Sequence, residues 1–346
     1  MQYEILPQID EKVSKICLGT MTWGQQNDEH QAHEQMDFAL SEGVNFWDTA
    51  EMYPSPPDKD KQGDTERHMG TWFAKTGQRD KVILASKISP MSFLRDGETR
   101  FRAQHISSAI DGNLERLQTD YIDVYQLHWP ERQANFFGQR GYSEEMAAQS
   151  LEDLTPFLET IQALNDEIKK GRIRAYGLSN DTAWGLMRYL WEADKNGLIA
   201  PITVQNPYSL LNRLYEVNMA EVAHRENVGL LAYSPLGFGV LSGKYLNGQR
   251  PAGARLTKYD RFERYTNEQA ISATEQYAKI ASDAGLDMAQ MALAFVNTRS
   301  FVTSNIIGAT SIEQLKSNID SVDVHLSDEV LAAIEAVHTR QPNPSP

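Results

Sequence analysis

A rhythm along the chain constrains its fold more than any other feature, because short apolar runs alternate with longer amphipathic stretches. Apolar runs of this length are typical of buried strands, and the stretches between them have helical periodicity. Strands that alternate with helices form parallel sheets joined by right-handed crossovers. Eight runs predict an α/β protein with the closed (β/α)8 TIM barrel fold. They lie at residues 15–19, 44–47, 82–85, 121–127, 173–178, 202–204, 228–232 and 305–307.

The predicted helices fill the spaces between these runs. They lie at about residues 30–42, 64–76, 103–118, 155–170, 182–197, 215–226, 267–283, 287–298 and 311–320, and a last helix reaches about residue 338. An N-terminal β-hairpin is predicted before the barrel, with strands at 3–6 and 12–16. The proline-rich tail, residues 342–346, is predicted to fray.

Two long segments interrupt the rhythm after the fourth and seventh strands, at residues 130–153 and 234–265. Loops of this length in a compact barrel are commonly lids or binding loops. A chain of 346 residues is long enough for two domains, but one barrel with these insertions accounts for the length equally well. We therefore predict a single domain over residues 1–346.

The composition narrows the classes of partner. The formal net charge is −14, and an acidic surface is unfavourable for binding nucleic acid or an anionic membrane. Cys17 is the only cysteine, which excludes an internal disulfide and a multi-cysteine zinc site. No apolar stretch approaches the roughly 20 residues of a transmembrane helix, and the first residues lack the pattern of a signal peptide. The expected location is the cytoplasm.

A candidate proton-transfer site begins where the second run ends. The apolar residues 44–47 are followed by Asp48, and Tyr53 follows in a loop whose prolines prevent a helix from starting at once. A carboxylate and a phenol this close, at the mouth of a strand, could belong to a proton-transfer site. The spacing Asp48-x-x-Glu51 also fits a helix N-cap with its box partner, and these residues alone leave that alternative open.

Other polar side chains follow the remaining runs, and the carboxyl ends of barrel strands share one rim, where we expect them to converge. Lys87 can lower the pKa of the Tyr53 phenol, and Asp48 can balance the charge of Lys87. His128 can polarise a carbonyl. Without a nucleophile or a metal ligand set, the site predicts proton transfer at a carbonyl or alcohol oxygen, with hydride from a cofactor. Further strand ends carry Ser179, Asn180, Gln205, Asn206, Tyr233 and Ser234.

A dinucleotide site would have to be built without the usual motifs, because no Rossmann G-x-G-x-x-G opens a helix and no Walker A is present. Barrels often bind phosphate after strands 7 and 8 instead, at a helix N-terminus. Glycines, Lys244 and Arg255 follow the seventh run, and residues 308–311 lead from the eighth run into a helix. These groups could bind a pyrophosphate and a further phosphate, and Tyr233 could stack on a flat ring. Simple turn chemistry also explains the glycines.

Seven short motifs identify a family. They are LGTM at 18–21, FWDTAEMY at 46–53, ASK at 85–87, DYIDVYQLH at 120–128, GLSN at 177–180, QNPY at 205–208 and IGAT at 307–310. Through these motifs the chain resembles the aldo-keto reductases over nearly its whole length. Within that family it is most similar to the bacterial Tas-type proteins and the potassium-channel β-subunit branch, through TWG at 22–24, QNPYSLLNR at 205–213 and YSPLG at 233–237.

The resemblance implies an NADPH-dependent (NADP+) oxidoreductase that reduces aldehydes or ketones to alcohols. The catalytic tetrad of the family falls on Asp48, Tyr53, Lys87 and His128, with Tyr53 as the general acid. The implied substrate pocket comprises Trp23, Tyr53, His128 and Trp129. The implied cofactor-binding residues are Gly19, Thr20, Met21, Asp48, Ser179, Asn180, Gln205, Tyr233, Ser234, Pro235, Leu236, Gly239, Leu241, Lys244, Arg255, Gly308, Thr310, Gln314 and Asn318.

Several points stay open at this level. Lys244 and Arg255 favour NADPH over NADH, because they could bind a 2′-phosphate. Aromatic residues near the pocket favour an apolar or aromatic carbonyl compound as the small-molecule partner. One alternative is a cofactor-bound redox sensor or regulatory protein with slow turnover, and another is a barrel isomerase or lyase acting on a phosphorylated substrate. An oligomer is compatible with the sequence.

Overall fold

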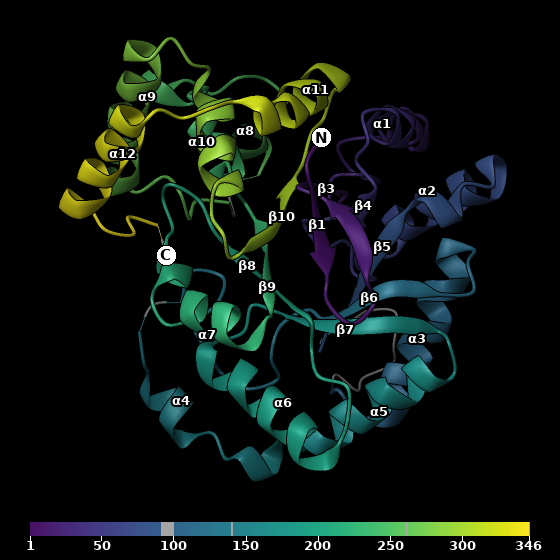
Figure 1. Ribbon diagram of the computed structural model, residues 1–346. Coiled ribbons are helices and arrows are strands. Elements are labelled where there is room, and N and C mark those ends of the chain that lie inside the picture. The colour runs from purple at the N-terminus through teal and green to yellow at the C-terminus, as the bar shows by residue number, and fades with distance from the viewer. Residues whose placement is uncertain (91–99, 140, 260–261, 346) are drawn as a thin grey trace.

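The computed structural model describes residues 1–90, 100–139, 141–259 and 262–345. Eight parallel strands close into a barrel in the order β10-β3-β4-β5-β6-β7-β8-β9, which confirms the predicted (β/α)8 fold (Figure 1). The barrel strands are β3 (Ile16–Gly19), β4 (Phe46–Asp48), β5 (Ile83–Ile88), β6 (Ile122–Leu127), β7 (Ile173–Ser179), β8 (Thr203–Pro207), β9 (Gly229–Tyr233) and β10 (Val302–Ile307).

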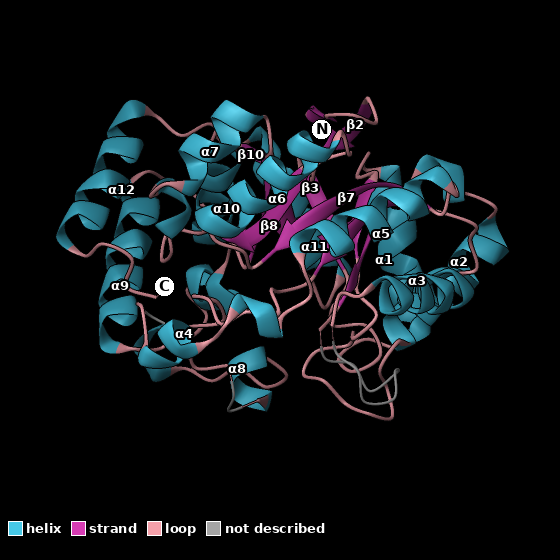
Figure 2. Cartoon of the chain, turned by 90° about the horizontal axis from the view of Figure 1, so that it is seen from below, coloured by secondary structure: helices cyan, strands magenta, loops and turns pink. Residues whose placement is uncertain are grey.

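Helices surround the barrel, and many loops gather at its lower end in Figure 2. The helices between and after the strands are α1 (Glu29–Ser41), α2 (Asp64–Thr76), α3 (Ala103–Leu117), α5 (Phe157–Lys169), α6 (Ala183–Asn196), α7 (Met219–Glu226), α9 (Glu268–Asp283), α10 (Met288–Asn297), α11 (Ile312–Asp320) and α12 (Asp328–Arg340). The two predicted long loops contain α4 (Glu144–Ala148) and α8 (Arg255–Lys258). Residues 140 and 260–261 of these loops lie outside the described residues.

The predicted N-terminal hairpin is formed by β1 (Tyr3–Leu6) and β2 (Glu11–Ser14), which pair antiparallel. Leu6 and Val13 are fully buried in one apolar cluster with side chains of the barrel interior. Burial of these two side chains fixes the hairpin against the barrel, because apolar area removed from water stabilises the contact.

Alternation along the strands divides the barrel interior into layers, since residues two apart on a strand share a face. The lower layers are apolar and contain Cys17, Phe46, Ile83, Ala85, Val124, Ala175, Leu231 and Ile306. Two residues further along, the same faces carry Asp48 on β4, Lys87 on β5 and Gln126 on β6. The strand pattern therefore places an apolar plug beneath a polar layer at the carboxyl ends.

Two local expectations from the sequence are wrong. Asp48 does not cap a helix, because residues 49–63 contain no helix and α2 begins only at Asp64. Residues 342–345 of the tail do not fray, and residue 346 lies outside the described residues: the Arg213 backbone N–H donates to Asn343 Oδ1 at 2.6 Å, and Ser345, fully buried, donates its N–H to the Leu211 carbonyl at 3.0 Å. These hydrogen bonds compensate for the ordering of the tail. Among the described residues, no helix is long and apolar enough to cross a membrane.

Candidate active site

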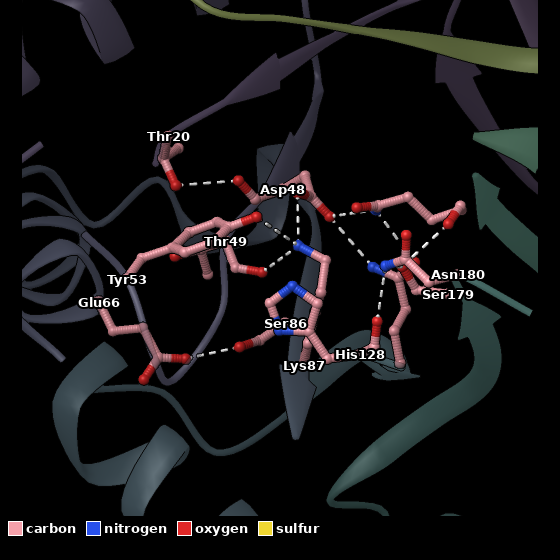
Figure 3. A network of polar contacts seen from close by, with 12 residues as sticks. Thr20, Asp48, Thr49, Tyr53, Glu66, Ser86, Lys87, His128, Ser179 and Asn180 are labelled. Carbon is pink, nitrogen blue, oxygen red and sulfur yellow. Dashed lines mark hydrogen bonds and ion pairs between the residues drawn. The ribbon is translucent and has the colours of Figure 1, made fainter. Parts of the chain in front are cut away.

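A buried ion pair forms the centre of the polar layer (Figure 3). Lys87 Nζ lies 2.6 Å from Asp48 Oδ2 and also donates to the Thr49 carbonyl at 2.7 Å. The Lys87 side chain is fully buried. Burial lowers the pKa of Lys87, but the charge of Asp48 more than offsets this, so that the pKa lies above its ordinary value. Lys87 is therefore a permanent cation at neutral pH.

Two glutamines hold the second oxygen of the same carboxylate. Gln126 Nε2 donates to Asp48 Oδ1 at 3.0 Å, and Gln205 Nε2 donates to it at 2.7 Å. Gln205 Nε2 also lies 3.1 Å from Gln126 Oε1. Asp48 thus accepts from three side chains on three other strands, which locks its position. Gln126 was missed at the sequence level, although a glutamine on the inward face of an apolar run was a usable signal.

Tyr53 lies beside the ion pair in the loop after β4. Its hydroxyl is 3.4 Å from Lys87 Nζ, and the ammonium lies 4.9 Å from the centroid of its ring. Burial raises the pKa of Tyr53, and the positive charge of Lys87 opposes this rise without cancelling it. The expected effect of Lys87 is present, but the net shift is upward, so the phenol keeps its proton at neutral pH.

His128 follows β6 and faces the phenol, with its ring 5.8 Å from that of Tyr53 (Figure 3). Burial lowers the pKa of His128 well below its ordinary value, and the charge of Lys87 lowers it further. The ring is therefore neutral at neutral pH. Its Nδ1 lies 3.2 Å from Ser89 Oγ. When Nδ1 accepts from this hydroxyl, Nε2 carries the proton and can donate to a ligand.

A cavity of about 1270 Å³ opens above these groups. Most of the predicted residues line it: Gly19, Thr20, Met21, Asp48, Tyr53, His128, Trp129, Asn180, Gln205, Tyr233, Ser234, Pro235, Leu236, Gly239, Lys244, Arg255, Gly308, Thr310, Gln314 and Asn318. Both long loops contribute to the wall, through Phe137 and Arg264 among others. Arg264 was not singled out from the sequence, where its place in a predicted binding loop was the only signal.

Four predicted residues do not line the cavity, and one of them is Lys87, whose side chain is fully buried. Trp23 is fully buried in the core, where its indole N–H donates to Gln35 Oε1 at 3.2 Å. Leu241 is also fully buried in the core, as its apolar side chain favours. Ser179 lies beneath the surface and donates to the Gln205 carbonyl at 2.9 Å. Ser179 also accepts from Asn180 Nδ2 at 3.1 Å, so it supports a neighbour that does line the cavity.

Two further cations, Lys244 and Arg255, line the cavity. Burial lowers the pKa of Lys244, and the neighbouring Arg255 lowers it further. Burial also lowers the pKa of Arg255. In the described part of the chain, neither side chain forms an ion pair with a carboxylate. Gly239 has φ +92°, and a Cβ there would lie 2.9 Å from Lys244 Nζ, so the glycine leaves the ammonium accessible.

The loop after β10 adds an anion-compatible helix start. Ser311 caps α11, its side chain accepting from the Gln314 backbone N–H. A Cβ on Gly308 would meet nothing within 4 Å, so this glycine leaves open space beside the helix N-terminus. Helix N-termini favour negative groups. No group of three or more His, Cys, Asp or Glu side chains able to hold a metal occurs among the described residues.

Barrels of this architecture carry their chemistry at the carboxyl ends of the strands, so fold and site together define a (β/α)8-barrel enzyme. The chain belongs to the aldo/keto reductase family, whose model matches residues 15–339, and it is therefore an oxidoreductase. The resemblance stated from the motifs is confirmed. The family generally uses nicotinamide cofactors and acts on small molecules.

Relatives extend over the whole chain. It is 51% identical to Protein tas of Escherichia coli K12, over 100% of both chains. It is 33% identical to the uncharacterized oxidoreductase YrpG of Bacillus subtilis, over 97% of this chain and 96% of the relative. A probable voltage-gated potassium channel subunit beta of Oryza sativa subsp. japonica is 29% identical, over 99% of this chain and 98% of the relative.

Proposed function

We propose that this protein reduces aldehydes or ketones to alcohols with NADPH, and that Tyr53 is the proton donor. One observation carries the proposal: a protonated phenol and a neutral imidazole face the same cavity above a buried ammonium. This pair can protonate and polarise a carbonyl oxygen together. The proposed site belongs to a soluble protein of the cytoplasm.

The residues present fit a nicotinamide dinucleotide with a 2′-phosphate. Lys244 and Arg255 lack a counter-charge among the described residues, and phosphate oxygens would supply it. The loop after β10 and the start of α11 would take the adenosine end, through Gly308, Thr310 and Gln314. Asn180 and Gln205 would hold the nicotinamide carboxamide. Tyr233 lines the cavity next to them, and its hydroxyl donates to Asn180 Oδ1 at 2.6 Å.

When bound, the reduced nicotinamide supplies the hydride. His128 donates from Nε2 to the carbonyl oxygen and orients it. Tyr53 transfers its proton to the same oxygen, which completes the alcohol and leaves a phenolate. Lys87 stabilises that phenolate across 3.4 Å. Asp48 and the two glutamines keep the ammonium in place throughout.

A redox sensor with slow turnover is the second candidate, favoured by the likeness to a potassium channel subunit beta. Turnover with a panel of aldehydes separates the two. The sensor should bind NADPH and oxidise it very slowly with every aldehyde. An isomerase or lyase acting on a phosphorylated substrate should not bind NADPH at all, which a fluorescence titration detects.

The Tyr53→Phe variant tests the proton donor directly. Removing a general acid costs about 10²–10⁴-fold in rate, so carbonyl reduction should fall by that factor. NADPH binding, followed by fluorescence titration, should stay unchanged, because the phenyl ring still fills the same space. Tyr142→Phe is the matched control, since Tyr142 is 81% exposed and does not line the cavity, so this variant should reduce carbonyl compounds at the wild-type rate. Full turnover in Tyr53→Phe would remove the acid role.

The Lys244→Ala variant tests the choice of cofactor. A charge-assisted hydrogen bond contributes about 1.5–3 kcal/mol, so NADPH binding should weaken roughly 10–100-fold. NADH, which lacks the 2′-phosphate, should bind almost as before. Lys195→Ala, at an exposed position on α6, is the control for a lost surface charge. Equal weakening of both cofactors would mean that Lys244 does not recognise the 2′-phosphate.

A further inference from the structure

Arg264 is a cavity-lining cation that the proposed reaction does not use. The residue is half-buried, in the long segment after β9. Its guanidinium carbon lies 5.9 Å from the centroid of the Phe137 ring and 6.0 Å from that of Tyr265. Aromatic contacts on two sides hold the guanidinium in the wall of the cavity rather than letting it extend into solvent.

No counter-charge balances this guanidinium within the described residues, where it forms no ion pair with a carboxylate. Its neighbour Glu263 also lines the cavity, but that side chain is exposed and makes no ion pair with Arg264. An arginine keeps its charge at any pH of interest and presents a planar fork that matches a carboxylate. A half-buried, uncompensated arginine at a binding cavity is thus suited to an anionic ligand group.

Arg264 is connected to the proton-donating pair along two walls. On one side, the Trp129 ring lies 4.9 Å from His128 and 5.7 Å from Phe137, which the guanidinium contacts. On the other side, Tyr233 also lines the cavity and lies close enough to both Arg264 and Tyr53 for each of them to act on its phenol electrostatically. Arg264 and the proton-donating pair therefore share the wall of one cavity, along which an aromatic carbonyl compound could extend.

Lys244 and Arg255, the proposed phosphate-binding groups, line the same cavity as Arg264. The charge of Arg255 lowers the pKa of Lys244, so these two cations are close neighbours. Arg264 is not among the groups that shift the pKa of either one. Arg255 and Arg264 both contact Phe238, at 5.5 Å and 5.8 Å. A contact between Arg264 and the cofactor is therefore the rival explanation, and the experiment has to distinguish it.

We infer that Arg264 binds a carboxylate of the substrate, so that the preferred substrates are carbonyl compounds with an apolar or aromatic body and an anionic group remote from the carbonyl. The body would pack against Trp129 and Phe137. This inference rests on the proposed reductase function and specifies the substrate class of the same site.

The test compares two aldehydes that differ in charge but hardly in size, 4-carboxybenzaldehyde and 4-methylbenzaldehyde. The wild-type protein should have the lower KM for the carboxylated compound. Arg264→Gln should raise that KM roughly 10–100-fold, the loss expected for one charge-assisted hydrogen bond. The KM for 4-methylbenzaldehyde and the Kd for NADPH should not change. Arg264→Lys should restore part of the preference, and Arg225→Gln, at an exposed position on α7, is the control.

Three results would overturn the inference. One is an equal loss with both aldehydes, and another is a wild-type protein with no preference for the charged compound. The third is weaker NADPH binding in Arg264→Gln, which would assign the arginine to the cofactor. If the wild-type protein reduces neither aldehyde, the proposed function fails instead. The role of Arg264 can then still be tested by binding. The Kd of 4-carboxybenzyl alcohol for the NADPH complex, measured by tryptophan fluorescence, should be higher for Arg264→Gln than for the wild type, and equal Kd values would overturn the inference.

Discussion

Burial determines the pKa values of Tyr53 and His128 as much as their charged neighbours do. At Tyr53, the ammonium of Lys87 lowers the pKa of the phenol, but burial raises it by a larger amount. The phenol is therefore a proton reservoir at neutral pH rather than a ready base. His128 shows the opposite sign for the same reason, since burial disfavours the charged imidazolium.

These shifts predict the pH dependence of reduction. Reduction needs the protonated phenol, and the pKa of Tyr53 lies above its ordinary value of about 10, so the rate should stay level from neutral pH to about 9 and fall only above about 10. The lowered pKa of His128 means that no step should occur near pH 6.5. The measurement is kcat/KM for NADPH-dependent reduction against pH. An alkaline limb with its midpoint below 9 would show that Lys87 outweighs burial.

At the scale of elements, the C-terminal tail is hydrogen-bonded to two segments of the barrel and does not extend freely into solvent. It joins the segment after β8 to the start of α9, since Asn267 Nδ2 donates to the Pro344 carbonyl at 2.9 Å. Asn267 Nδ2 also donates to Ser345 Oγ at 3.2 Å, and the Arg213 and Leu211 backbones supply two further hydrogen bonds to the tail. The tail is thus bonded to two elements that lie far apart along the chain.

Deleting residues 342–346 should therefore destabilise the protein. Four hydrogen bonds at about 0.5–1.5 kcal/mol each predict a loss of roughly 2–6 kcal/mol in the free energy of unfolding. Urea denaturation followed by circular dichroism measures this loss. Deleting only Pro346 is the control and should leave the midpoint unchanged. An unchanged midpoint for the longer deletion would show that the tail contributes nothing to stability.

For the whole molecule, closure of the barrel depends on β3, which pairs with β10 on one side and β4 on the other. Cys17 lies in the middle of this strand, fully buried, and burial raises the pKa of its thiol well above the ordinary value. The thiolate is the reactive form. The reactivity of the Cys17 thiol therefore indicates whether β3 is paired in the closed barrel or exposed to solvent.

The native protein should not react with a thiol reagent such as DTNB over hours, and one thiol per chain should react at once in denaturant. The rate at intermediate urea concentrations should follow global unfolding measured by circular dichroism. A control without reagent excludes damage to the fold by the label. Rapid labelling of the native protein would mean that β3 separates from its neighbours without global unfolding.

The sequence predicted features that are local or periodic, and it missed those that depend on packing between distant segments. The strand rhythm was sufficient for the barrel, and Lys87 and His128 stood out because each ends or follows an apolar run. Trp23 looked like a pocket residue because aromatic side chains near a site are common there, yet its indole is satisfied by Gln35 in the core. Gln126 is the converse case, since its contact with Asp48 joins residues far apart in the chain. No single-sequence pattern encodes the packing of Trp23, and for Gln126 the inward position within an apolar run marks a polar interior residue but not its partner.

The ion pair between Asp48 and Lys87 has a consequence for how such a protein can change. Replacing a buried ion pair by well-packed apolar side chains is often neutral, or stabilising by about 1–4 kcal/mol. A barrel selected only for thermal resistance would therefore tend to lose this pair to residues such as methionine and leucine. Retention of the pair in an otherwise apolar interior marks a compromise between durability and chemistry. Engineering for heat tolerance should accordingly leave these two positions alone and look for its gains in the outer helices.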